Sequence, residues 1–206
     1  MKFFLLIYLI LFYGVAFFWR SYVTWQATGI NPYRLSNKDD IPSFLGRVYR
    51  LVFIGNITIV LLYILGPAHW YSYLGPLDWL EESVGTAVGI LLLILAFPWV
   101  LISQAQMGSS WRIGIDEQNQ TALVTQGIFR FSRNPIFLGV RLNLLGWFLI
   151  MPNAFTLALW LLGDVSIQIQ IFLEENHLHQ QHGIVYEQYM SITPRYLGIP
   201  GVLNNK

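Results

Sequence analysis

Long apolar runs divide this chain into five segments separated by shorter polar stretches. Apolar residues dominate approximately 3–19, 50–66, 84–103, 136–151 and 153–173. A helix needs roughly 17–25 residues to cross a bilayer at about 1.5 Å per residue, and each run except the fourth has that length. Met151-Pro152-Asn153 joins the fourth run tightly to the fifth. The pattern therefore predicts five transmembrane helices, of which the last two form an antiparallel helical hairpin.

The composition agrees with an all-α integral membrane protein. Hydrophobic residues make up 55% of the 206 residues and charged residues only 11%, whereas a soluble domain carries about 25% charged residues. So little charge cannot cover a surface that faces water. The net charge of +1 gives no support to a nucleic-acid partner, and the absence of cysteine excludes disulfides, thiolate metal ligands and thiol nucleophiles.

The N-terminal run differs from a secretory signal. Lys2 precedes apolar residues from Phe3 to Trp19, and Arg20-Ser21-Tyr22 follows them. Signal peptides have about 7–15 apolar residues before a small-residue cleavage site. We therefore expect a first span that is retained.

The positive charges predict the orientation in the membrane. Loops 20–50 and 104–135 and the C-terminal tail together hold ten basic residues: Arg20, Arg34, Lys38, Arg47, Arg50, Arg112, Arg130, Arg133, Arg195 and Lys206. The other side holds Lys2 alone. Because basic loops stay in the cytoplasm, we expect the N-terminus outside and the C-terminus in the cytoplasm. The absent cysteine and the short loops suit a bacterial inner membrane.

The connecting loops carry weaker signals. Loop 67–83 is rich in tryptophan and tyrosine, which favours anchoring at the level of the lipid headgroups over a ligand role. Asn31-Pro32 and Ile41-Pro42 predict turns, and Pro98 predicts a kink in the third span. Residues 107–127, with a polar turn at 116–120, predict a short hairpin at the cytoplasmic face.

A basic segment precedes the fourth span. Gly127 permits a tight turn, and Asn134-Pro135 suits the first turn of a helix. The unpaired N–H groups of that helix start, with Arg130 and Arg133 beside them, can receive an anion. An ordinary helix start flanked by orienting arginines explains the same residues.

The last two spans contain polar side chains that are costly in hydrocarbon and so mark a candidate site. Arg141 lies six residues into its span; its side chain either reaches back to the interface or pairs with an acidic group on the fifth span. On the fifth span Asp164 shares a face with Gln168, and Gln170 shares one with Glu174.

Glu174 and Glu175 follow one another and must diverge by about 100° on a helix. One carboxylate can therefore point into the bundle while the other points to water, and a solvated helix end is the alternative for both. The histidines at 177, 179 and 182 lack the i, i+4 spacing of a helical zinc site, so we expect no metal. There is no glycine-rich phosphate loop or nucleophile elbow, so if the protein is an enzyme, we expect it to work by holding two substrates.

Two separated motifs resemble one family. Leu123-Val124-Thr125-Gln126-Gly127-Ile128-Phe129-Arg130-Phe131-Ser132-Arg133-Asn134-Pro135-Ile136-Phe137-Leu138-Gly139 resembles the Leu-Val-x-x-Gly-x-Tyr-x-x-x-Arg-His-Pro-x-Tyr-x-Gly motif of isoprenylcysteine carboxyl methyltransferases and related phospholipid methyltransferases. Glu174-Glu175-Asn176-His177-Leu178, followed by Gly183, Tyr186, Tyr189 and Pro194-Arg195, resembles their ending. The resemblance covers roughly residues 107–197.

This resemblance implies S-adenosylmethionine as methyl donor at the cytoplasmic face and a lipophilic acceptor from the bilayer. The positions that match the family's donor-binding residues are Thr121, Ala122, Leu123, Val124, Phe129, Arg133, Asn134, Pro135, Ile136, Phe137, Glu174 and Tyr186. Glu174 would take the ammonium of the donor, and Phe129 and Phe137 would flank its adenosyl or sulfonium part.

The chain departs from the family at three points. Asn134 stands where the family has His, and Phe129 and Phe137 stand where it has Tyr. Gln170 stands where the isoprenylcysteine enzymes carry an Arg that faces the substrate carboxylate, so an isoprenylcysteine acceptor is doubtful. Gln170 and Arg141 are the candidate catalytic residues, and Arg141 replaces the missing cation only if it points inward.

We therefore expect residues 1–103 to be a scaffold of three spans and residues 104–206 to be the catalytic half of one structural domain. The expected function is methyl transfer from S-adenosylmethionine to a lipophilic molecule, similar to that of the isoprenylcysteine enzymes. A phospholipid or isoprenoid-quinone methyltransferase is the alternative, and a non-catalytic membrane scaffold or carrier is the alternative from another class. Membrane lipids are the other expected partners.

Overall fold

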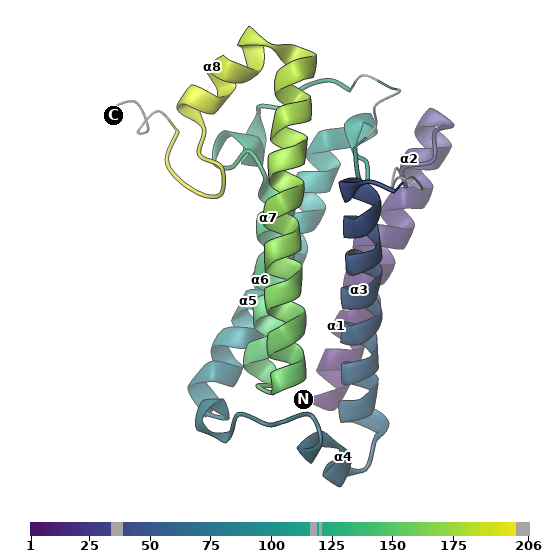
Figure 1. Cartoon of the computed structure of the whole chain (residues 1–206), viewed down its shortest axis with the longest axis vertical. Helices are drawn as coiled ribbons and strands as arrows, with labels where there is room; N and C mark the ends of the chain where they lie inside the picture. Colours follow the sequence, from purple (N-terminus) through teal and green to yellow (C-terminus); the bar gives the residue numbers. More distant parts are fainter. Residues whose placement is uncertain (34–38, 116–118, 120, 201–206) are drawn as a thin grey trace.

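A computed structural model describes residues 1–33, 39–115, 119 and 121–200, and these residues form a helical bundle. The long helices run along one axis, with the short helix α4 at one end and α8 at the other (Figure 1). The elements are α1 (Lys2–Tyr13), η1 (Gly14–Trp19), α2 (Arg20–Thr28), α3 (Ile41–Leu65), α4 (Ala68–Ser72), η2 (Asp78–Leu80), α5 (Ser83–Met107), η3 (Gly108–Ser110), η4 (Gly127–Arg130), α6 (Pro135–Ile150), α7 (Ala154–His182) and α8 (Ile184–Ile192).

Four of these helical segments are long and apolar enough to cross a membrane, so this is an integral membrane protein. They are Lys2–Thr28, Ile41–Leu65, Ser83–Ser110 and Ala154–His182. The fourth predicted span corresponds to α6, which has 16 residues and is shorter than the others. Three residues separate α6 from α7, and the rings of Phe148 and Trp160 stack between them with centroids 5.5 Å apart. The count of five spans and the orientation in the membrane stay predictions.

The helices extend further than the apolar runs. The first segment continues from residue 19 to Thr28, and α3 begins at Ile41 instead of residue 50. Asp40 caps α3, because its Oδ1 accepts from the Ser43 backbone N–H at 2.9 Å. The predicted turn at Ile41-Pro42 is therefore wrong. Proline is accommodated in the first turn of a helix, where its missing N–H has no partner to lose.

The prediction of a short hairpin over 107–127 is also wrong for the residues of this segment that the structure describes. Ile113 forms an isolated bridge with Tyr33, and the Ser110 hydroxyl contacts the Ala122 carbonyl at 3.3 Å. No strand forms on either side of the predicted turn within these described parts, and residues 116–118 and 120 lie outside the description. The Ile113 N–H donates instead to the carbonyl of the distant Pro32 at 2.8 Å.

Arg20 and Gln104 join the first helical segment to α5. Arg20 Nη2 donates to the carbonyls of Gln104 and Gly108 at 2.8 and 2.7 Å. A cation at a helix C-terminus satisfies carbonyls that lack a partner in the helix. Gln104 Nε2 donates in turn to the Ala16 carbonyl at 2.8 Å. These contacts fix η1 against the end of α5.

Helices α5 and α6 pack extensively against each other, and two glycines meet at their contact. A Cβ atom on Gly89 would lie 2.8 Å from the Gly146 carbonyl oxygen and 2.7 Å from Ile150 Cγ1. Small residues let helix backbones approach in this way in membrane proteins. The pairing holds α6 in the bundle although α6 is short.

Replacing Gly89 by leucine should therefore destabilise the protein by about 1–3 kcal/mol, the usual cost of overpacking a filled interior. Thermal unfolding in detergent measures the effect as a lower Tm. Gly14→Ala is the matched control, because Gly14 has helical dihedrals and nothing lies within 4 Å of its Cβ position. Equal Tm values for the two variants would contradict the close α5–α6 contact.

Candidate functional site

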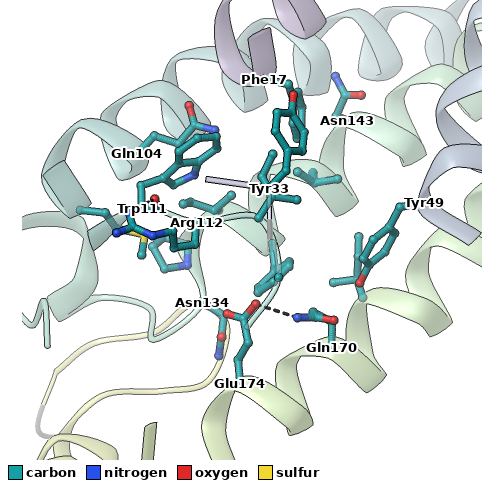
Figure 2. Close-up of a pocket in the computed structure, with 18 of the residues that line it drawn as sticks. Phe17, Tyr33, Tyr49, Gln104, Trp111, Arg112, Asn134, Asn143, Gln170 and Glu174 are labelled. Atoms are coloured by element: carbon teal, nitrogen blue, oxygen red, sulfur yellow. Dashed lines mark hydrogen bonds between the residues drawn. The ribbon is translucent and has the colours of Figure 1, made fainter. Parts of the chain in front are cut away.

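A cavity of about 540 Å³ lies between the helices and is the candidate site. Its walls come from α1, η1, α3, α5, α6 and α7 and from residues 121–124 (Figure 2). Glu174, Gln170, Asn134 and Arg112 supply polar groups, whereas much of the remaining wall is aromatic or aliphatic. Ligand pockets of about 300–1,000 Å³ with few polar groups are typical of small-molecule sites.

Glu174 provides a carboxylate at the polar end of the cavity. Gln170, one turn earlier on α7, donates its Nε2 to Glu174 Oε1 at 2.9 Å, which confirms that the two side chains share a face. Figure 2 shows Glu174 and Asn134 at this same end. A partly buried carboxylate with one amide donor suits a cationic group of a ligand.

Glu175 has a different role, because its carboxylate is the centre of a buried ionic cluster. Its Oε1 is 3.1 Å from Arg133 Nη2 and accepts from Asn134 Nδ2 at 2.9 Å. Its Oε2 is 2.6 Å from Arg195 Nη2. The residue is 6% exposed. The expectation that one carboxylate of the pair points to water is therefore wrong: one faces the cavity and the other is sealed by two guanidinium groups.

The same cluster ties the segment 127–134 to the C-terminal segment 193–198. Arg133 N donates to the Pro194 carbonyl at 2.9 Å, and Gly198 N donates to the Phe131 carbonyl at 3.1 Å. The Arg133 guanidinium also reaches the Thr193 carbonyl at 2.5 Å. These backbone contacts fix the loop that leads into α6, and with it the position of Asn134.

The charges outside the spans are consistent with this packing. The hydrogen bond to Glu175 raises the pKa of the Arg195 guanidinium, so Arg195 stays charged. Burial raises the pKa of the Tyr189 phenol, which stays neutral and donates to the Phe129 carbonyl at 2.6 Å. Segment 127–134 is thus held by groups that keep one protonation state around neutral pH.

The start of α6 follows the prediction from sequence. Gly127 has a φ of 61°, and Pro135 occupies the first turn behind Asn134 at the N-cap. The Asn134 side chain makes no capping bond and instead contacts Glu175 and the Arg195 carbonyl. Asn134 therefore bonds to the ionic cluster and does not cap the helix.

Most of the predicted site residues line the cavity. Those that do are Thr121, Ala122, Leu123, Val124, Phe129, Arg133, Asn134, Pro135, Ile136, Phe137, Gln170 and Glu174. Tyr186 does not: it is 1% exposed, and its ring packs 6.1 Å from that of Tyr189. Burial raises the pKa of its phenol as well. Tyr186 packs against Tyr189, which lines the cavity, and itself lies outside the cavity wall.

Arg141 does not face the cavity, so the expectation that it replaces a missing cation there is not met. Its Nε lies 2.5 Å from Asp164 Oδ1, and its guanidinium carbon lies 4.6 Å from the Tyr196 ring centroid. Of the two alternatives for Arg141, pairing with the fifth span is confirmed. Gln168 donates to Asp164 at 2.7 Å and completes the group. The Arg141 guanidinium therefore pairs with the Asp164 carboxylate and supplies no positive charge to the cavity.

Aromatic residues from the first half of the chain also line the cavity and were missed. They are Phe12, Tyr13, Phe17, Phe18 and Phe53, which stand inside apolar runs, and Tyr33 and Tyr49, which stand in loop 20–50. Inside an apolar run, nothing in the sequence separates a cavity-lining aromatic residue from a lipid-facing one. The cavity therefore draws residues from both sides of residue 103. Within the described chain, no group of three or more acidic or histidine side chains is placed to hold a metal ion.

Residues 84–184 match the family model described as phospholipid methyltransferase (PEMT). The chain carries a domain of this family. The phospholipid methyltransferase domain runs from the start of α5 to the start of α8 and includes Asn134, Gln170 and Glu174. No curated protein matches the chain in a sequence comparison. The match and the long apolar helices together indicate a membrane methyltransferase. The family resemblance is confirmed, and the match covers the first motif and the second motif as far as residue 184.

Replacing Glu175 by glutamine should lower the stability of the protein by about 3 kcal/mol, because two guanidinium groups lose their buried partner. Unfolding in detergent, followed by circular dichroism, measures the loss as a lower Tm. Glu174→Gln is the matched control, since it removes a charge that contacts only the Gln170 amide among the described hydrogen bonds. A control variant that unfolds as early as Glu175→Gln would contradict the separate roles of the two carboxylates.

Proposed function

We propose that this protein transfers a methyl group from S-adenosylmethionine to a lipophilic acceptor bound in the same cavity. One observation carries the proposal: a single cavity joins the Glu174–Gln170–Asn134 end to a wall of aromatic and aliphatic side chains. A charged nucleoside and an apolar molecule need these two environments side by side. The phospholipid methyltransferase domain supplies most of the polar end.

The donor occupies the polar end in this proposal. Glu174 accepts hydrogen bonds from the ammonium of the donor, and Gln170 holds the carboxylate in place through its 2.9 Å bond. Phe129 and Phe137 line the cavity and offer ring faces to the adenosyl group or the sulfonium. Residues 121–124 close the cavity over the nucleoside.

The reaction needs positioning more than acid–base chemistry. The nucleophile of the acceptor attacks the methyl carbon, the carbon–sulfur bond breaks, and the electron pair leaves with sulfur as a neutral thioether. Correct alignment of two reactants is worth about 7–11 kcal/mol of the barrier. Among the described residues that line the cavity there is no histidine to serve as a base. The arrangement therefore favours an acceptor that arrives ionised or already nucleophilic.

The acceptor in this proposal is a lipid that does not depend on a carboxylate-binding cation. Gln170 occupies the place of the arginine in the isoprenylcysteine enzymes and bonds to Glu174, and Arg141 is paired with Asp164 outside the cavity. The two positions that would hold a substrate carboxylate thus supply no positive charge to it. A phospholipid or isoprenoid-quinone acceptor fits these residues better than an isoprenylcysteine.

The cavity end with Glu174 faces the cytoplasm in this proposal, because the donor is a water-soluble metabolite made there. The prevalence of arginine and lysine at loops 20–50 and 104–135 supports the same orientation. A bacterial inner membrane remains the predicted location.

The proposed activity is tested with purified protein, radiolabelled S-adenosylmethionine and a total lipid extract. We expect label to appear in one lipid class, which chromatography and mass spectrometry then identify. A non-catalytic carrier is the competing reading: it would bind no S-adenosylhomocysteine and would leave every lipid unlabelled.

Glu174→Gln should weaken S-adenosylhomocysteine binding roughly tenfold to a hundredfold. A hydrogen bond to a charged group contributes about 1.5–3 kcal/mol, and about 1.4 kcal/mol changes an affinity tenfold. Isothermal titration calorimetry measures the Kd. Glu187→Gln is the control, since Glu187 lies on α8 and pairs with the exposed His179. Unchanged affinity in the Glu174 variant, or an equal loss in the control, would reject the assignment of Glu174.

A further inference from the structure

The first membrane helix contains an irregular segment that borders the cavity. Residues Gly14–Trp19 form a π-helix, η1, between the α-helices α1 and α2. Such wide turns are rare and occur frequently at functional sites. Here η1 contributes two consecutive phenylalanines, Phe17 and Phe18, to the cavity wall. Neighbours on a regular α-helix diverge by about 100°, so the wide turn helps both rings border one space.

Phe18 marks a place where the cavity reaches the outer surface of the bundle. Its side chain lines the cavity and yet is 59% exposed. Across from it on α3 lies Phe53, whose ring centroid is 6.4 Å from that of Phe18 and 4.7 Å from that of Tyr13. At this point the wall between η1 and α3 consists of ring contacts, which are side-chain contacts that rotamer changes can separate.

Arg50 indicates how deep the Phe18–Phe53 contact lies in the membrane. It lies three residues before Phe53 on α3, so the two share a face, and its exposed side chain also lines the cavity. Arginine in a membrane helix carries its charge to the headgroup level while its stem stays in the apolar layer. Arg50 Nε donates to the Gly46 carbonyl at 3.2 Å, one turn nearer the start of α3, so the Phe18–Phe53 contact lies deeper in the apolar layer than this charge.

We infer that the aromatic residues Tyr13, Phe17, Phe18 and Phe53 form the acceptor subsite, and that the apolar tail of the acceptor leaves the cavity between η1 and α3. The inference rests on the proposed function. The ligand class is a membrane lipid with its reactive group toward Glu174 and its chain between Phe18 and Phe53. Since the cavity of about 540 Å³ must also hold the donor, the lipid tail extends beyond it into the bilayer.

A reversible cross-link between η1 and α3 tests this path. The chain has no native cysteine, so Phe18→Cys/Phe53→Cys carries the two reactive thiols and no others. A short bifunctional thiosulfonate reagent joins them, and a reducing agent releases them. We expect cross-linking to lower methyl transfer from radiolabelled S-adenosylmethionine to the total lipid extract at least tenfold. Reduction of the same sample should restore its rate, and S-adenosylhomocysteine should bind equally in both states.

The control joins α3 to the other end of the first helical segment, Lys2–Thr28. Lys2 Nζ donates to the Ile64 carbonyl at 3.2 Å and lies 5.8 Å from the Tyr63 ring centroid, and neither Lys2 nor Tyr63 lines the cavity. Lys2→Cys/Tyr63→Cys, cross-linked in the same way, should keep its rate of lipid methylation.

The outcomes separate the inference from the proposed function. Equal methylation before and after cross-linking at Phe18 and Phe53 overturns the lipid path, as does an equal loss in the control pair. Absence of labelled lipid with the wild-type protein overturns the proposed function itself. If the Phe18/Phe53 double variant binds no S-adenosylhomocysteine, single replacements by leucine are compared instead. A raised KM for lipid at unchanged donor Kd supports the subsite, and an unchanged KM in both single variants rejects it.

Discussion

The buried carboxylate of Glu175 is the interaction on which the site depends. It meets Arg133, Asn134 and Arg195 within 3.1 Å and so connects α7, the start of α6 and the C-terminal segment. A buried charge is tolerated when its oxygen atoms are fully satisfied by donors, and here charged and amide donors surround it. Because Glu175 is fixed, its neighbour Glu174 is turned to the cavity. The buried Glu175 thereby sets the direction of Glu174, the carboxylate that we propose binds the donor.

The sequence predicted the features that are local. Helix-length apolar runs, the turn at Gly127 and the helix start at Pro135 each depend on a few neighbouring residues, and each is found. The ends of the helices were missed, because Asp40 and the Arg20 contacts with α5 extend helical structure beyond the apolar runs. A hydropathy pattern does not contain such capping interactions.

The sequence predicted the polar part of the candidate site but not its aromatic wall. Its polar residues stand out because charges and amides are rare in membrane spans, and twelve of the fourteen predicted positions line the cavity. Which carboxylate of the pair faces inward depends on the rotation of α7 about its axis, and the partner of Arg141 depends on a contact across 23 residues. The aromatic wall has no local signal at all, since phenylalanine in an apolar run looks the same in a cavity as in lipid.

The division of the cavity between the two halves of the chain has a consequence for specificity. The phospholipid methyltransferase domain begins at residue 84, so the aromatic residues of α1, η1 and α3 lie outside it. Substitutions among those rings leave the ionic cluster around Glu175 untouched. Under the proposed function, substitutions in the first two helices would change which molecule is methylated, while the half proposed to hold the nucleoside stays the same.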